Sequence, residues 1–532
     1  MDGWRESLLA TKGIVDIEFP QNCGSTFRFK VRSAPLFAQI GSRTRHNPIL
    51  VDDRLRPIIK QQGIEMPEPR LLFAHRNGAT YATDSHPLRG LRSNRPFDFA
   101  LSSQGLSTCI RLGVICPERE AKPLNQYLYQ SQHIHPPNKT EKDYLIDYPG
   151  FQPAFGIPLD VPTPGDSAWA ACPEPKFSGS NKESCLELAN LIIRSIDAVV
   201  AAEKPHVILI YIPNRWATLR DYQDEHEHFD LHDFVKAYCV RKGIATQFLE
   251  EHTLSSAQPC RVWWWLSVAL YAKAMRTPWV LEVLDSDAAF VGLGFTIDRY
   301  APRGQHVIMG CSHLYNARGE GLQFRLSKIE NPIIRHRNAH MSYEDARRVA
   351  ETIRQLFFES QFRLPHRVVV HKQTRFLNEE KNGLLDGLSG VSAVDLLEIN
   401  VDASLRYVSS VARENGSFDE DNFPVRRGTV VKLDNLKALL WSHGVSDAVI
   451  QGWKYFQGKR HIPAPLLLTR HSGNTDLELL SAEILGLSKM DWNSADMYSK
   501  LPATIHSSKQ IARIGVKLQR FGPVSYDYRL FI

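Results

Sequence analysis

The segment LHDFVKAYCVRKGIATQFLEE, residues 231–251, decides the fold class because a helical pattern, a stop signal and a strand follow one another within it. Apolar residues recur at helical spacing over 231–242, and Gly243 then offers the left-handed backbone that commonly ends a helix. The same alternation continues on both sides of this segment. We predict helices at 183–200 and 259–275, and strands at 206–213, 245–251 and 279–284. This β-α-β-α-β order predicts a parallel sheet with helices on its faces, where ligands bind beyond the carboxyl ends of the strands.

A different pattern begins near residue 286. Three strand-like runs separated by turn-rich links predict an antiparallel meander: 288–298, 305–315 and 321–329. Ser342, with Asp345 three residues on, is expected to cap a helix that precedes a buried strand at 366–372. Three antiparallel strands, a helix and a fourth strand form the opening order of an RNase H-like fold. The chain is therefore predicted to be an α/β protein with three regions: an irregular α+β lead-in over 1–170, a Rossmann-like domain over 171–285 and an RNase H-like domain over 286–532.

The composition is that of a folded protein with no membrane segment. Apolar residues make up 43% of the 532 residues, and the net charge of +6 permits binding to nucleic acid without requiring it. The eight cysteines contain no C-x-x-C pair, which disfavours a cysteine zinc site. The sequence has no signal-peptide pattern and no apolar run of about 18 residues, so we expect a cytoplasmic location, reduced thiols and no membrane partner.

Four polar residues of the middle region form a candidate site for a small anion. His232 and Lys236 are four residues apart and share a helix face, Gln247 begins the next strand, and Lys273 lies near the end of the next helix. Cations and an amide suit a terminal phosphate, because each donates to its oxygens and the lysines balance its charge. The alternative, which spacing alone favours, is that the lysines are solvated and His232 is incidental.

These four residues, in this order and spacing, resemble the guide-anchoring motif of the MID domain of Argonaute proteins. Segments at 290–298, 366–376 and 487–505 resemble parts of the PIWI domain, the RNase H-like half of the same proteins. The resemblance covers about residues 180–532, and PGFQPAFG at 149–156 suggests that it begins earlier. The length, and the lack of obvious N and PAZ domains, resemble the short prokaryotic Argonautes.

The resemblance implies a function and a set of partners. The MID domain would bind the 5′ phosphate of a guide RNA that pairs with a target DNA. In several prokaryotic members Mg²⁺ or Mn²⁺ bridges that phosphate to the C-terminal carboxylate, which here belongs to Ile532 of SYDYRLFI. A terminal strand is the simpler interpretation of this segment, and the two are compatible. The short members act in defence with a separate effector protein that carries an Argonaute-associated (APAZ-like) domain, so a heterodimer is expected.

The catalytic positions of a slicing PIWI domain are not acidic in this chain. An RNase H-like nuclease holds two metal ions with several carboxylates. The corresponding positions fall at Gly294, Gln373 and Ser508 (or Ser507), so we expect binding without cleavage. One alternative is a guide-dependent endonuclease with a non-standard metal site that uses Asp298, on the same strand face as Gly294. Another is an interaction protein that keeps only the fold.

Two further clusters carry weaker signals. DEHEHFDLHD at 224–233 holds three histidines and five acids, so a metal site is conceivable, although a solvated loop is favoured. RHRNAH at 335–340 is basic and could contact a phosphate backbone, although a lone cluster of this kind is more often a solvated turn.

Overall fold

The computed structural model describes most of the chain from residue 63 to residue 531. Within that range it leaves out the following residues: 78–79, 105, 139–143, 176–179, 226, 283–286, 299–305, 316–320, 337, 403–409, 413–414, 416–417, 421–422, 451, 459–462, 495 and 519–524. Residues 1–62 and Ile532, the predicted metal-ligating residue, also lie outside the described residues.

The middle of the chain forms a parallel sheet, as predicted. Strands β10 (Ala245–Glu250), β7 (Val207–Ile212), β4 (Ile110–Cys116) and β5 (Leu159–Asp160) lie in this order, and β6 (Trp169–Ala171) also pairs with β4. Side chains alternate along β7, so its two faces pack on different helices. Ile208 and Ile210 pack in a core with α6 (Asn181–Ala202) and α7 (Leu231–Arg241). Val207 and Leu209 belong to the core that contains α4 (Ala121–Tyr129) and α9 (Pro259–Lys273).

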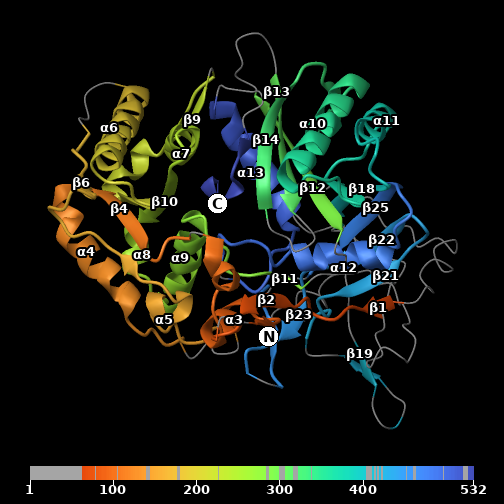
Figure 1. Cartoon of the computed structure of the whole chain (residues 1–532), viewed down its shortest axis with the longest axis horizontal. Coiled ribbons are helices and arrows are strands. Elements are labelled where there is room, and N and C mark those ends of the chain that lie inside the picture. Colours follow the sequence, from red (N-terminus) through yellow and green to blue (C-terminus); the bar gives the residue numbers. More distant parts are fainter. Residues whose placement is uncertain are drawn as a thin grey trace, which may run out of the picture.

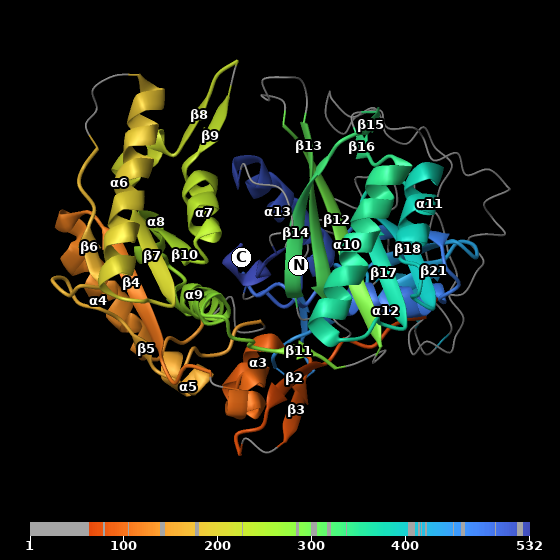
Figure 2. The same cartoon turned by 45° about the horizontal axis from the view of Figure 1, so that its top comes forward.

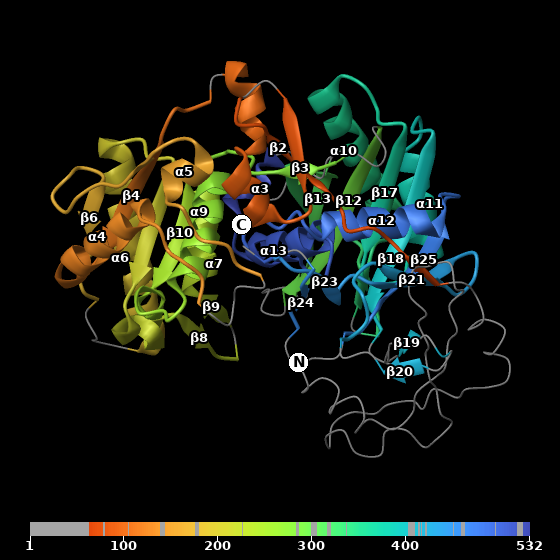
Figure 3. The same ribbon diagram turned by 90° about the horizontal axis from the view of Figure 1, so that it is seen from below.

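One predicted strand of this sheet lies elsewhere, so its predicted placement is wrong. Residues 280–281 of the predicted strand 279–284 form β11 (Val280–Leu281), which pairs antiparallel with β2 (Leu71–Ala74). With β3 (Tyr81–Asp84) they form a three-stranded sheet between the two larger sheets (Figure 3). An apolar run predicts a buried strand but not its partner, and the next strand beside β7 is β4, from within 1–170.

The second half of the chain forms the predicted RNase H-like sheet. Strand β12 (Ala288–Asp298) pairs antiparallel with β13 (His306–Tyr315), which pairs with β14 (Gly321–Ile329). On its other side β12 pairs parallel with β17 (Arg367–Lys372), and β17 pairs parallel with β18 (Ala393–Val401). The same ten-stranded sheet also contains β25 (Leu466–Ser472), β22 (Lys437–Trp441), β21 (Thr429–Lys432), β1 (Gly63–Glu65) and β26 (Ser525–Tyr526).

Helices cover both faces of the ten-stranded sheet. Helix α10 (Tyr343–Gln361) starts where predicted, because the Ser342 side chain accepts a hydrogen bond from the Asp345 amide, and it packs with α11 (Asn378–Gly387) on one face. Helices α12 (Leu477–Leu487) and α13 (Ala503–Leu518) pack in the core of the other face. Helix α13 also contacts α7, so it lies between the two sheets (Figures 1 and 2).

Shorter elements complete the fold: α3 (Pro87–Ser93), α5 (Phe151–Phe155), α8 (Glu251–Leu254) and four hairpins, β8 (Asp221–Gln223) with β9 (His228–Asp230), β15 (Ile333–Arg335) with β16 (Asn338–His340), β19 (Ser410–Ala412) with β20 (Phe418–Glu420), and β23 (Val445–Asp447) with β24 (Lys454–Phe456). No helix in the described part of the chain combines the length and apolar composition that a bilayer crossing requires.

Candidate nucleic-acid interface

Three of the four predicted anion-site residues lie close together, where α7, β10 and α9 meet. Lys236 comes from α7, Gln247 from β10 and Lys273 from the last position of α9. The Lys273 ammonium donates to Gln247 Oε1, and Lys236 Nζ donates to the Thr246 carbonyl at 3.3 Å. We call Lys236, Gln247 and Lys273 the lysine cluster.

Both amines of the lysine cluster are out of contact with solvent. Lys236 is 1% exposed and Lys273 is 3% exposed. Burial lowers the pKa of Lys236 to about 8, and burial together with the like charge of Lys236 lowers the pKa of Lys273 well below its ordinary value. Lys273 has no ion pair with any carboxylate in the described residues. An anion placed beside both amines would offset the cost of burying them as cations.

His232 lies on the same helix but is half-exposed. Its Nδ1 is 3.2 Å from Asp233 Oδ1, and its ring centroid is 4.9 Å from that of Phe248, next to Gln247. The Asp233 carboxylate therefore fixes one edge of the imidazole and leaves Nε2 as the group available to a ligand.

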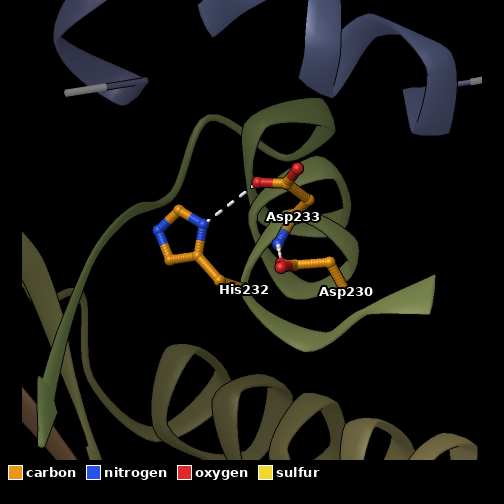
Figure 4. Close-up of side chains that lie close together, drawn as sticks. All are labelled: Asp230, His232 and Asp233. Carbon is orange, nitrogen blue, oxygen red and sulfur yellow. Dashed lines mark hydrogen bonds and ion pairs between the residues drawn. The ribbon is translucent and has the colours of Figure 1, made fainter. Parts of the chain in front are cut away.

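Asp230, His232 and Asp233 bring part of the acidic segment 224–233 together (Figure 4). Their ligand atoms lie within 4.8 Å of one another, and two carboxylates with an imidazole are a donor set that transition metals accept. Both carboxylates already have structural roles. Asp230 caps α7 by accepting from the Asp233 amide at 2.8 Å, and Asp233 Oδ1 accepts from Arg513 of α13 at 3.0 Å.

The C-terminal end of the chain reaches the elements that carry the lysine cluster. The turn Tyr528–Leu530 contacts α9 and β10, and the buried Phe531 accepts a hydrogen bond through its carbonyl from Gln510 of α13 at 3.0 Å. Figure 2 places this end between α9 and α13. The lysine cluster itself supplies two cations and an amide and no carboxylate, so these three residues do not by themselves form a site for a divalent ion.

Two of the three predicted catalytic positions line a cavity of about 760 Å³ in the RNase H-like region. It lies at the carboxyl ends of parallel strands, where Leu293 of β12 pairs with Lys372 of β17 and Lys372 pairs with Glu398 of β18. Gly294 and Gln373 line this cavity.

Ser508 is completely buried behind Gly294, and its Oγ donates to the Ile505 carbonyl at 3.1 Å. A Cβ added at Gly294 would lie 2.5 Å from the Ser508 carbonyl carbon and 2.6 Å from the Lys509 amide nitrogen. The backbone of α13 therefore occupies the space into which a side chain at position 294 would project.

The charge of this cavity is basic. Among its described lining residues Glu398 is the single carboxylate, and it is held by His471 at 2.7 Å and by Asn400. Asp298, the alternative catalytic residue, lines a different groove, with α7 and α13. The basic lining residues are Arg335, His336, His340, Lys372, Arg375 and Lys509. Arg335, His336 and His340 of the basic segment thus line the cavity, whereas Arg375 and Lys509 carried no signal in the sequence.

The fold defined by these two sheets is that of the Argonaute MID and PIWI domains. The structure of Clostridium butyricum Argonaute bound to a guide DNA (5′ deoxycytidine) and a 19-mer target DNA matches 88% of this chain and 55% of that chain, with a TM-score of 0.59 and 13% identity. A crystal structure of Aquifex aeolicus Argonaute with externally bound siRNA matches 88% of this chain and 56% of that chain, with a TM-score of 0.56 and 17% identity.

The sequence comparison agrees with the fold. The curated "Protein argonaute" of Aquifex aeolicus (strain VF5) is 24% identical over 314 residues, which are 57% of this chain and 39% of that protein. No family model matches the sequence. The chain thus has the fold of the Argonaute MID and PIWI domains, with a Rossmann-like region followed by an RNase H-like region, and it spans about half the length of the solved Argonautes that it is similar to.

Proposed function

We propose that the chain binds a guide strand by its 5′ phosphate at the lysine cluster and holds the guide–target duplex against the PIWI sheet. The guide is RNA and the target is DNA in this proposal. The observation that carries it is the pair of buried lysines, because two amines brought together without solvent favour a bound anion.

Each residue of the anchor has a distinct task. The protonated amines of Lys236 and Lys273 donate to the phosphate oxygens. Gln247 holds the Lys273 ammonium through Oε1, while its Nε2 donates to the Phe248 carbonyl at 2.8 Å, so the amide orientation is fixed. His232 donates from the more exposed side. Base pairing then reads the sequence, and the protein contacts only the backbone.

The PIWI region is proposed to bind without cutting. Two-metal cleavage needs several carboxylates in fixed geometry, and Gly294, Gln373 and Ser508 provide none. A guide-dependent endonuclease with a non-standard metal site is the second candidate, and it would have to use Glu398, which His471 and Asn400 already engage. The test is a labelled target incubated with the guided chain and Mg²⁺ or Mn²⁺. We expect intact target, and cutting at one defined position would promote the endonuclease.

A chain that binds without cutting needs a second protein to respond, and we propose an effector with an APAZ-like domain in a cytoplasmic heterodimer that serves prokaryotic defence. We also propose that a Mg²⁺ or Mn²⁺ ion would bind between the guide phosphate and the Ile532 carboxylate, and that no other residue of the chain would hold it. Purification of the tagged chain from its own host tests the partner.

The anchor is tested by comparing two RNA guides of one sequence, one with a 5′ phosphate and one with a 5′ hydroxyl. Fluorescence anisotropy should give a much lower dissociation constant for the phosphorylated guide. Equal affinity for the two guides would refute the anchor. Weak binding to both would favour an interaction protein that keeps only the fold.

A further inference from the structure

We propose that the cavity between Gly294 and Gln373 is an anion site that binds a phosphodiester of the target strand directly through side chains. This inference rests on the proposed function, because it needs a guide-bound chain that captures a target. In this proposal the cavity binds the nucleic-acid backbone directly, at the position where a slicing relative would hold metal ions.

The position of this cavity in the sheet is typical of a ligand-binding site. The parallel pairing of β12, β17 and β18 ends here, at Leu293, Lys372 and Glu398, and ligands of α/β folds bind at the carboxyl ends of parallel strands. The hairpin of β15 and β16 and the helix α13 supply further walls. Residues distant in the sequence therefore meet at one point of the sheet.

Of the four lysine and arginine side chains that line the cavity, one is neutralised and three are available. Lys372 is buried and pairs with the buried Glu380 at 2.6 Å, so its charge is balanced within the protein. Arg335, Arg375 and Lys509 are exposed, and the described residues provide no carboxylate partner for them. These three cations come from β15, from the loop after β17 and from α13, and we call them the cavity cations.

Neutral donors accompany the cavity cations. Gln373 carries an amide, and Thr374 Oγ1 is buried with no hydrogen-bond partner among the described residues, although Thr374 lines the cavity. Hydroxyl and amide donors beside arginine and lysine are the usual contacts of a phosphate oxygen. The single carboxylate, Glu398, is engaged elsewhere and does not oppose an incoming anion.

The donor set argues against a metal ion at the same place. A divalent ion of the Mg²⁺ type requires oxygen ligands, chiefly carboxylates, and three nearby cations would repel it. The backbone of α13 against Gly294 also leaves no room for a carboxylate at that position. The cavity is thus suited to the charge of a nucleic-acid backbone rather than to the ions that would cut it.

The test removes two cavity cations and leaves the lysine cluster intact. The double variant Arg375→Gln/Lys509→Gln is compared with Arg194→Gln/Lys122→Gln, which removes two exposed cations from the outer helices α6 and α4. Each protein is loaded with the same 5′-phosphorylated RNA guide, and DNA target affinity is measured as a function of salt. We expect unchanged guide affinity, target binding weakened by about tenfold or more, and a shallower salt dependence by roughly one phosphate contact.

A chemical change in the target locates the contact. One phosphate at a time is replaced by a neutral methylphosphonate, and one or two adjacent positions should reproduce the loss in the wild-type chain. The same replacement should add nothing in the Arg375→Gln/Lys509→Gln variant, because the partner charge is already gone. Additive losses at every position would overturn the proposal.

The outcomes separate this inference from the proposed function. A double variant with normal guide binding and wild-type target affinity refutes the anion site alone. A wild-type chain that ignores the 5′ phosphate refutes the proposed function and removes the premise. Competition by a millimolar nucleoside monophosphate that also requires Arg375 and Lys509 would assign the site to a free nucleotide and overturn the target-strand assignment.

Discussion

Gly294 of β12 lies against the backbone of Ser508 in α13, so closely that a Cβ at position 294 would approach the Ser508 carbonyl carbon to 2.5 Å. The absence of a carboxylate at this position is therefore built into the packing of a helix on a strand. A single substitution cannot restore it, because the helix must first move.

Gly294→Ala is expected to lower the free energy of unfolding by about 1–3 kcal/mol, the usual cost of overpacking against an atom that cannot yield. Gly486→Ala is the matched control, since its nearest neighbour is the flexible end of Leu281 at 3.2 Å and the position lies in α12. That variant should be neutral or slightly more stable. Chemical denaturation measures both, and equal effects would mean that α13 adjusts freely.

Lys236→Met and Lys273→Met should each weaken guide binding without lowering the stability of the free chain. Each removes a buried cation, so the chain without guide should unfold at a higher temperature or stay unchanged. Affinity for a 5′-phosphorylated guide should fall by about 1.5–3 kcal/mol, the scale of one charged hydrogen bond. Lys242→Met, at an exposed pair with Asp197, should change neither property appreciably. Guide affinity that survives both cluster substitutions would exclude the lysine cluster from the anchor.

Guide binding should weaken as the pH rises above about 8. The pKa of Lys236 is lowered from its ordinary value of 10.5 to about 8, so the free chain has released this proton at higher pH, and a bound phosphate must bring it back. The advantage of a phosphorylated over a hydroxyl guide should then shrink by up to about tenfold per pH unit until the pKa of the complex is passed. Anisotropy titrations from pH 6 to 10 measure it, and a flat profile would contradict the prediction.

The same shift makes a prediction for stability without guide. Between about pH 8 and 10.5 the unfolded chain holds the Lys236 proton that the folded chain has lost, so the free energy of unfolding should rise with pH across this window. Below pH 8 both states hold the proton and the contribution of Lys236 is constant. The Lys236→Met variant should lack this rise.

If the Ile532 carboxylate takes part in the proposed guide anchor, extension of the C-terminus by a few residues should displace it. Because Phe531 is buried and hydrogen-bonded to Gln510, an extension starts from a fixed point close to α9 and β10. Guide affinity should fall and its response to Mg²⁺ should fade. An extended chain with normal affinity and an unchanged Mg²⁺ response would remove Ile532 and the metal ion from the anchor.

The sequence predicts those elements best whose formation depends on the local residue pattern and on the order of elements along the chain. The meander of β12, β13 and β14 and the Ser342 cap of α10 follow from alternation and from local capping chemistry. The lysine cluster could be predicted because its members lie on α7, β10 and α9, which are close together in the sequence. Strand β11 and the cations Arg375 and Lys509 could not be placed, since their neighbours are set by tertiary pairing between distant segments.

The earliest and latest described strands occupy opposite edges of the ten-stranded sheet, β1 beside β21 and β26 beside β14. During synthesis on the ribosome this sheet cannot close either edge until nearly the whole chain has emerged, because β1 must wait for residues 429–432 and β14 for residues 525–526. The parallel MID sheet is complete once β10 has left the tunnel. A nascent chain would therefore hold a complete parallel sheet beside the open edges of the second sheet, which pair readily with other strands and make this interval the one most exposed to aggregation.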